Sequence, residues 1–194
     1  MLYKKNFLTI LLISIVFALA GASFGIEMGW TITDLQQQGI EAELVQPNYY
    51  LLDTPPNPHN SFDSYIVRTD PDEGIFWIKA LGKDISVNSY GTQLKTEYEK
   101  INSQLSSIYG VGEKVDFLFY DSIWDEADDW MYGLKVGERF FYTSWEDIED
   151  ESIKKVFVGA NATSSSSGYI SVEYYSPNYD SLKQKAENRE SAAF

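Results

Sequence analysis

The clearest periodic pattern in the chain predicts a long amphipathic helix over residues 91–109. Apolar side chains recur there at steps of three or four residues, which places them on one stripe of a helix, and Gly110 follows as a stop signal. The stripe consists of Leu94, Tyr98, Ile101, Leu105 and Ile108. The opposite face is polar but not basic, so we expect the helix to cover a sheet and not to lie on a membrane.

A shorter helix is predicted near residue 31. Thr31 precedes a short apolar run and Asp34 follows three residues later, which is the spacing of a capping box. Trp30 and Leu35 have the spacing of a hydrophobic staple, and Gly39 is placed to end the helix in a left-handed conformation. A helix of about two turns is marginal on its own. We therefore expect it to pack against another element.

Ser122 and Asp125 repeat the capping-box spacing and predict a third helix that begins there and extends to about Leu134. The residues after Pro177 are polar and show no apolar stripe. For residues 177–194 we therefore expect a polar C-terminal tail or a frayed helix.

Strands are predicted where β-branched and aromatic residues cluster between turn sequences. These segments are residues 41–52, 62–69, 74–81, 114–120, 139–143, 153–161 and 169–175. The fold class that follows is α+β: antiparallel sheet covered by one long and two or three short helices, in a single domain over residues 23–176. A helix followed by strands occurs twice in the sequence. The pattern is therefore compatible with a domain of two similar halves and equally with one α+β sandwich without internal repetition.

The first 22 residues are typical of a secretory signal peptide. Lys4 and Lys5 precede an apolar run over residues 7–20, and small residues follow, with cleavage expected after Ala22 or after Ala20. The alternative is an uncleaved membrane anchor, but the run is shorter than the roughly 20 residues that cross a bilayer. We expect a periplasmic or secreted protein with no membrane span after cleavage.

Composition narrows the possible partners and cofactors. The chain has no cysteine and a formal net charge of −14. Thiol chemistry and cysteine-bound zinc are therefore excluded, and we expect no cofactor. Nucleic acid and anionic membranes repel such a charge, whereas a basic exported or envelope protein would be attracted by it. The charge also has a simpler interpretation, which is solubility.

The densest acidic and aromatic segment, residues 121–130, is the candidate partner surface. Its candidate contact residues are Trp124, Asp125, Glu126, Asp128, Asp129 and Trp130. Aromatic side chains rimmed by acids have the composition of a protein-binding hot spot. Acids at this density suit calcium in principle, but the ligand order of a calcium loop is missing. The alternative interpretation is structural: acids stabilise the first turn of a helix, and most of the nearby aromatic residues lie in the core.

His59, the only histidine, lies in a proline-rich loop and joins the candidate surface. Asp53 and Asp63 are near enough in sequence to orient it for acid–base chemistry, although a lone loop histidine is more often an ordinary surface residue. With 29 acids, some carboxylate pair will have the spacing of a glycoside hydrolase by chance. We identify no catalytic residue and no metal ligand.

Residues 26–39, from Ile26 through Gly29, Thr31 and Asp34 to Gly39, resemble the opening of small exported domains built like β-lactamase inhibitor protein. That group includes the small lipoprotein of the outer-membrane β-barrel assembly machinery, whose acylated cysteine is missing here. The helix end at residues 105–110 is also similar to that of uncharacterised exported bacterial or phage-borne proteins. The resemblance implies an α/β sandwich that binds other proteins, and it assigns no functional residue.

Together these observations favour an exported, non-enzymatic protein-interaction module of the inhibitor, immunity or envelope-accessory type. Two alternatives remain: a hydrolase of envelope polysaccharide that uses a carboxylate pair, and a module that binds calcium or sugar.

Overall fold

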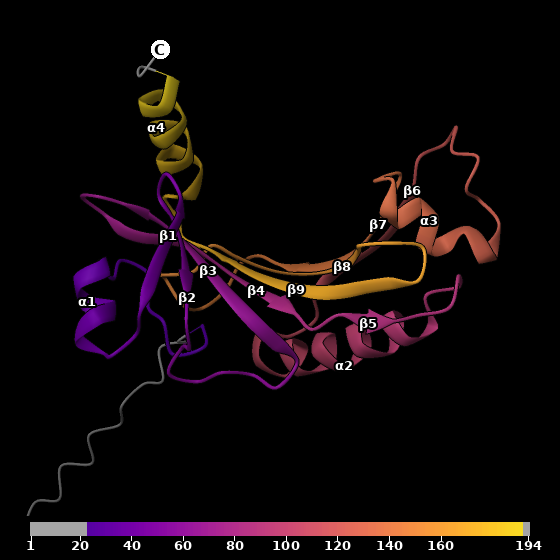
Figure 1. The fold of residues 1–194 in the computed structure, drawn as a ribbon, viewed down its shortest axis with the longest axis horizontal. Helices are drawn as coiled ribbons and strands as arrows, with labels where there is room; N and C mark the ends of the chain where they lie inside the picture. Colours follow the sequence, from indigo (N-terminus) through magenta and orange to yellow (C-terminus); the bar gives the residue numbers. More distant parts are fainter. Residues whose placement is uncertain (1–22, 192–194) are drawn as a thin grey trace, which may run out of the picture.

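The computed structural model describes residues 23–191, so the predicted signal peptide lies outside the described residues. Within them, the strands form one antiparallel sheet of nine members, and four α-helices pack around it (Figure 1). The predicted α+β fold class is therefore confirmed.

The strands are short to medium in length and end at turns. They are β1 (Ala42–Gln46), β2 (Tyr49–Leu52), β3 (Phe62–Asp70), β4 (Gly74–Gly82), β5 (Ile85–Ser86), β6 (Glu113–Leu118), β7 (Arg139–Trp145), β8 (Lys155–Ala162) and β9 (Ser167–Tyr175). The helices are α1 (Ile32–Gln37), α2 (Thr92–Tyr109), α3 (Trp130–Lys135) and α4 (Tyr179–Ser191), with a 3-10 turn at Ala127–Asp129.

The order of strands across the sheet is β1-β2-β3-β4-β9-β8-β7-β6, with β5 paired to β9. Helix α1 precedes the first four strands and α2 precedes the last four, while β4 and β9, the final strands of the two groups, pair in the middle. The helix-then-strands order that repeats in the sequence therefore repeats across the sheet, although α3 is inserted in the second group.

One face of the sheet carries the hydrophobic core. Successive strand residues point to opposite faces, and on this covered face Ile78, Val158 and Val172 pack in one cluster with Leu94 and Ile101 of α2. Helices α1 and α2 lie on this side of the sheet (Figure 1). The core thus lies between the sheet and these helices, as the stripe of apolar residues in α2 predicts.

The predicted start of α1 is confirmed. The amide of Asp34 donates to Thr31 Oγ1 at 3.2 Å, and the amide of Thr31 donates to the Asp34 carboxylate at 2.8 Å. These are the two reciprocal bonds of a capping box. Gly39 has a φ of 76° and takes the left-handed conformation expected after the helix.

The structure corrects three details of the prediction. Residues 41–52 form two strands and not one, because Asn48, with a φ of 65°, makes a turn between β1 and β2. Ile108 continues the stripe of α2 in the sequence but is 68% exposed, whereas the next residue, Tyr109, packs against the core. The helix predicted from Ser122 is wrong at its start, since residues 122–126 are not helical and α3 begins at Trp130.

The residues after Pro177 form α4, whose Leu182 and Ala186 are buried. The helix is held to the β3–β4 turn by ion pairs: Lys185 and Arg189 contact the Asp70 carboxylate at 3.0 and 2.7 Å. The side chain of Asp70 is fully buried. Helix α4 is therefore fixed at one end of the sheet (Figure 1).

Candidate functional site

The candidate site is the sheet face opposite α2, which we call the open face. In Figure 1 this side carries no helix between α4 at one end and the segment joining β6 to α3 at the other. Register and alternation place on it Tyr49, Leu51, Ile66, Arg68, Trp77, Lys79, Leu81, Phe117, Phe140, Tyr142, Phe157, Gly159, Asn161, Tyr169, Ser171, Glu173 and Tyr175. Most of these side chains are half-buried, so the face is rich in aromatic and aliphatic groups that solvent can reach.

A polar network crosses the middle of the open face. Glu173 forms an ion pair with Lys79 at 2.9 Å. The same carboxylate accepts hydrogen bonds from the Trp77 indole at 3.0 Å and from the Tyr175 hydroxyl at 2.5 Å. Burial, followed by the charge of Glu173, raises the pKa of Tyr175, so its phenol stays protonated. This network orients an indole and a phenol, and it holds both rings on the open face.

Three phenylalanines form the aromatic end of the open face, beside the edge strand β6. Phe117 lies opposite Phe140 in the register, and the Phe117, Phe119 and Phe140 ring centroids lie 5.7 to 6.4 Å apart. Each of the three side chains is 42–48% exposed. Phenylalanines that contact one another while remaining this exposed make an apolar patch, which is the kind of surface that a partner covers.

A hollow of about 310 Å³ lies beside the aromatic end, between β7, β8 and β9. Tyr142 and Phe157 form one wall, with ring centroids 5.0 Å apart. The Phe157 ring lies over Gly159, because a Cβ at that glycine would be only 2.7 Å from it. Asn161, which also lines the hollow, donates to Ser171 Oγ at 3.0 Å. The hollow thus combines aromatic walls with an oriented amide, a composition suited to receiving a side chain.

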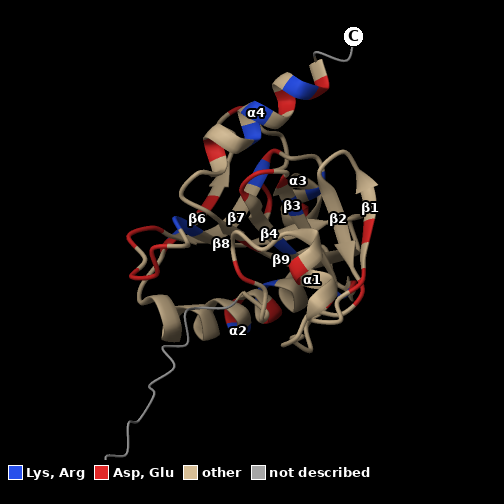
Figure 2. Cartoon of the chain, turned by 90° about the vertical axis from the view of Figure 1, so that its left-hand side faces the viewer, with Lys and Arg blue, Asp and Glu red and all other residues tan. Residues whose placement is uncertain are grey.

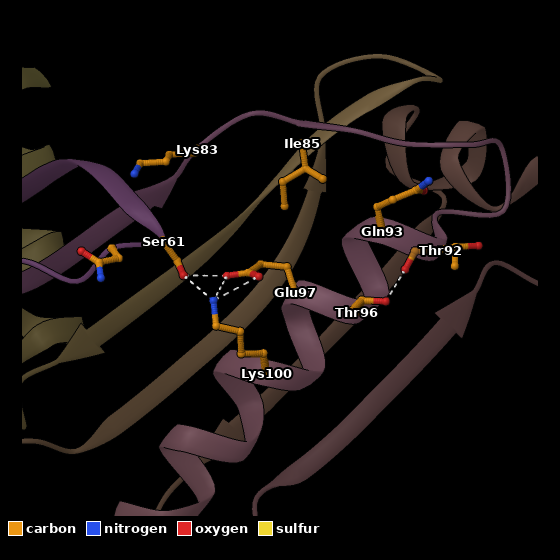
Figure 3. A pocket seen from close by; sticks show the side chains of 9 residues that line it. Ser61, Lys83, Ile85, Thr92, Gln93, Thr96, Glu97 and Lys100 are labelled. Carbon is orange, nitrogen blue, oxygen red and sulfur yellow. Dashed lines mark hydrogen bonds and ion pairs between the residues drawn. The ribbon is translucent and has the colours of Figure 1, made fainter.

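A second depression, the polar crevice, has a volume of about 460 Å³ and lies between α2 and the segment around β5 (Figure 3). Ser61 donates to the Glu97 carboxylate at 2.6 Å, and Lys100 donates to Glu97 at 3.0 Å and to Ser61 at 3.3 Å. Figure 3 shows these three side chains pointing toward one another from the loop and from α2. They satisfy one another's hydrogen-bonding groups.

The protonation of Glu97 limits what the polar crevice can do. Burial alone would raise the pKa of Glu97, but the hydrogen bonds from Ser61 and Lys100 outweigh it and lower the pKa. The carboxylate is therefore ionised and cannot act as a general acid near neutral pH. Among the residues that line the crevice, Glu97 is the single carboxylate. The two acids of a typical glycoside hydrolase are not both present there.

The two tryptophans of the predicted partner surface have different positions. Trp130 is 3% exposed and belongs to the core, where its ring lies 5.5 Å from Phe141 and 4.1 Å from the ammonium of Lys95. Trp124 is half-buried and packs on Tyr132 at 4.1 Å between ring centroids. Trp124 is therefore accessible to a partner, whereas Trp130 packs inside the molecule.

The acids of this segment lie in the link between β6 and α3. Asp125, Glu126 and Asp128 are exposed, and Asp129 is half-buried at the start of α3. Ser122 does not cap a helix here; its hydroxyl donates to Glu138 at 2.6 Å and accepts the amide of Trp124 at 3.2 Å. Within residues 23–191, no group of three or more acids or histidines is arranged to hold a metal ion.

His59 lies apart from residues 121–130, beside the polar crevice. Its Nδ1 accepts the amide of Ser61 at 3.2 Å, and its ring lies 5.4 Å from Phe62. No hydrogen bond joins it to Asp53 or Asp63 among the described residues. The histidine therefore shapes the loop that carries Ser61.

The negative charge is not gathered at one site. In Figure 2 acidic residues are spread over several segments, including β1, and α4 carries both signs. The open face itself has paired charges at its centre, where Lys79 meets Glu173. The sequence did not indicate which aromatic residues would share this face. The signal available was the alternation within the strands, and it is ambiguous in the run from Phe140 to Tyr142, where all three residues are aromatic.

No protein-family model matches this chain, and no curated protein or solved structure is significantly similar to it. Among the described residues, no helix is both long and apolar enough to cross a membrane.

Proposed function

We propose that this chain is an exported, non-enzymatic protein-binding module and that its partner binds the open face. The observation that carries the proposal is the aromatic end, where Phe117, Phe119 and Phe140 contact one another and remain exposed. Keeping such a patch in water is unfavourable, at about 25 cal/mol for each Å² of apolar surface. A partner that covers these rings recovers that free energy.

The rest of the open face has the composition of a protein interface. Tyrosine, tryptophan, phenylalanine and arginine are the residue types enriched at interface centres, and Tyr142, Phe157 and Trp77 all lie on this face. Their hydrogen bonds and ring contacts restrict their rotamers before binding, which lowers the entropy lost on association. The resemblance of residues 26–39 to protein-binding exported domains supports the same proposal.

The partner we propose is another exported or envelope protein. It presents apolar side chains to the aromatic end, and basic ones to the exposed acids Asp125, Glu126 and Asp128 nearby in the β6–α3 link. Trp124 lies in the same link and is half-buried. These charges should raise the association rate more than the affinity. Added salt should screen the attraction and lower the association rate.

Neither alternative has comparable support. A polysaccharide hydrolase needs two carboxylates across the sugar, whereas the polar crevice supplies Glu97 alone, and its lowered pKa keeps it ionised. A calcium module needs six or more oxygen ligands, and the described residues contain no acidic group of that kind. Binding without chemistry remains the function that the geometry favours.

The test is capture of partners by the tagged chain, residues 23–194, from an envelope extract of its source organism, with the captured proteins identified by mass spectrometry. The informative variant is Phe117→Ser with Phe140→Ser, and the control is Ile108→Ser with Val111→Ser, which removes exposed apolar groups at the other side of the sheet. A hot-spot residue contributes about 2 kcal/mol or more, so the first variant should lose its partner at least about tenfold. Equal capture by both variants would contradict the proposal.

A further inference from the structure

Arg68 is a buried cation that forms no ion pair with any of the described residues. Arg68 is 4% exposed, and its Nε is buried and has no hydrogen-bond partner among the described residues. The chain has two other arginines, and each contacts an aspartate: Arg139 meets Asp116 at 2.6 Å and Arg189 meets Asp70 at 2.7 Å. Within residues 23–191, Arg68 is thus the one arginine that forms no ion pair.

The surroundings of Arg68 are aromatic. Its guanidinium carbon lies 4.8 Å from the centre of the Tyr49 ring and 5.5 Å from that of Phe76. Tyr49 and Trp77 are its register partners on the neighbouring strands, so all three lie on the open face. Tyr179 of α4 completes the surroundings, since its ring lies 6.0 Å from Phe76 and its phenol interacts electrostatically with Arg68 and Tyr49.

Aromatic faces compensate only part of the cost of burying this charge. A cation–π contact is weaker than the interaction with water that a charged group loses when it is buried without a partner. A carboxylate is the group that matches the planar guanidinium, because it accepts two parallel N–H bonds. A doubly charged anion fits less well, because Glu173 already places a negative charge beside Trp77, the register partner of Arg68.

We infer that Arg68, framed by Tyr49, Phe76 and Tyr179, is the receptor for one carboxylate group of a ligand. The ligand's carboxylate enters at the half-buried rings of Tyr49 and Tyr179 and pairs with the guanidinium. The group comes either from an acidic residue or C-terminus of the protein partner, or from a free small carboxylate. Only the first source rests on the proposed function.

The first experiment uses sodium acetate as the probe and needs no protein partner. Acetate is titrated into the ¹⁵N-labelled chain at constant ionic strength with sodium chloride, and the Trp77 indole signal is followed by NMR. We expect a saturable shift in the wild type and in Arg139→Met, in which the arginine removed is a paired one. We expect no saturable shift in Arg68→Met. A shift that fails to saturate in the wild type, or that persists in Arg68→Met, overturns the inference.

Stability gives an independent readout. Replacing an uncompensated buried charge by an apolar side chain of similar length is neutral or stabilising, so Arg68→Met should unfold at the same urea concentration as the wild type or at a higher one. Arg139→Met should unfold earlier. Should Arg68→Met fail to fold, that failure overturns the view that the charge is uncompensated. Arg68→Lys then tests the binding itself, because lysine keeps the charge without the planar fork and should need about tenfold more acetate.

The source of the carboxylate is decided by repeating the capture experiment with Arg68→Met. Loss of the captured partner, together with loss of acetate binding, assigns the carboxylate to the protein partner. Retained capture with lost acetate binding assigns it to a small carboxylate. Failure of the proposed function leaves the acetate result unchanged, so the two conclusions are separable.

Discussion

The two faces of the sheet are built from the same strands but differ in how deeply their side chains are buried. In β8 and β9, Val158 and Ile170 point to the covered face and are almost fully buried. Their neighbours Phe157 and Tyr169 point to the open face and stay half-buried. The stability of the fold accounts for Val158 and Ile170, because burial of apolar surface stabilises the core. Core burial does not account for the half-exposed aromatic side chains on the open face, which no helix covers over most of its length.

The polar groups differ in the same way. On the covered face Tyr98 and Thr143 share one short hydrogen bond of 2.5 Å, and burial raises the pKa of Tyr98 to about 12. This bond gives each of the two buried hydroxyls a hydrogen-bond partner, so neither depends on a ligand for one. On the open face the network around Glu173 holds rings that solvent can reach, and the buried Nε of Arg68 has no hydrogen-bond partner within residues 23–191. The two hydroxyls on the covered face thus pair with each other, whereas the guanidinium of Arg68 on the open face forms no ion pair with any described residue.

The largest effect should come from breaking the covered face. Ile170→Ala removes a side chain that is 1% exposed and leaves a cavity against α2, which should cost about 2–5 kcal/mol of unfolding free energy. The adjacent Tyr169→Ala removes a larger side chain from the open face and should cost less. Urea unfolding followed by tyrosine and tryptophan fluorescence measures both. An equal loss in the two variants would show that the open face is also structural core.

A smaller and pH-dependent effect is expected at α4. Burial alone would raise the pKa of Asp70, but hydrogen bonds from the Asp72 amide, Lys185 and Arg189 lower it to about 2 from the ordinary 3.8. A lowered pKa means that the folded state favours the ionised form. Because the two cations are partly exposed, we expect Asp70→Asn to lose about 1–2 kcal/mol at pH 7.

The sign of the pH effect makes this prediction specific. The contribution of Asp70 is complete above the unfolded pKa of about 3.8 and disappears as the pH falls through about 2. The difference in unfolding free energy between wild type and Asp70→Asn should therefore shrink over that interval. Urea unfolding at pH 2, 3, 4 and 7 measures it. A constant difference would show that α4 is held by Leu182 and Ala186 alone.

Local features of the fold were readable from the sequence. The capping box of Thr31 and Asp34 involves only four consecutive residues. The apolar stripe of α2 follows from the helical period alone. Both features therefore depend only on the local sequence. Ser122 and Asp125 show the limit of such reasoning. The same spacing fails there because the Ser122 hydroxyl bonds to Glu138, a partner that local sequence does not specify.

The candidate site could not be read from the sequence in the same way. Arg68 forms no ion pair in the part of the chain that the structure describes, because the groups around it are aromatic. These neighbours include Tyr49 and Tyr179, which come from other elements of the chain. Phe117 and Phe140 meet only through the register of β6 with β7. Composition identified an aromatic and acidic stretch at residues 121–130, but it could not tell the buried Trp130 from the accessible Trp124.

The smallest effect on stability should come from filling the hollow on the open face. Gly159→Val places a Cβ only 2.7 Å from the Phe157 ring, and we expect this half-buried ring to turn toward solvent. Valine also suits a strand better than glycine, so the unfolding free energy should change by less than about 1 kcal/mol. Partner capture should nevertheless fall, because the side chain occupies the space between Tyr142 and Asn161. Capture that survives Gly159→Val but not the double change at Phe117 and Phe140 would confine the contact to the aromatic end.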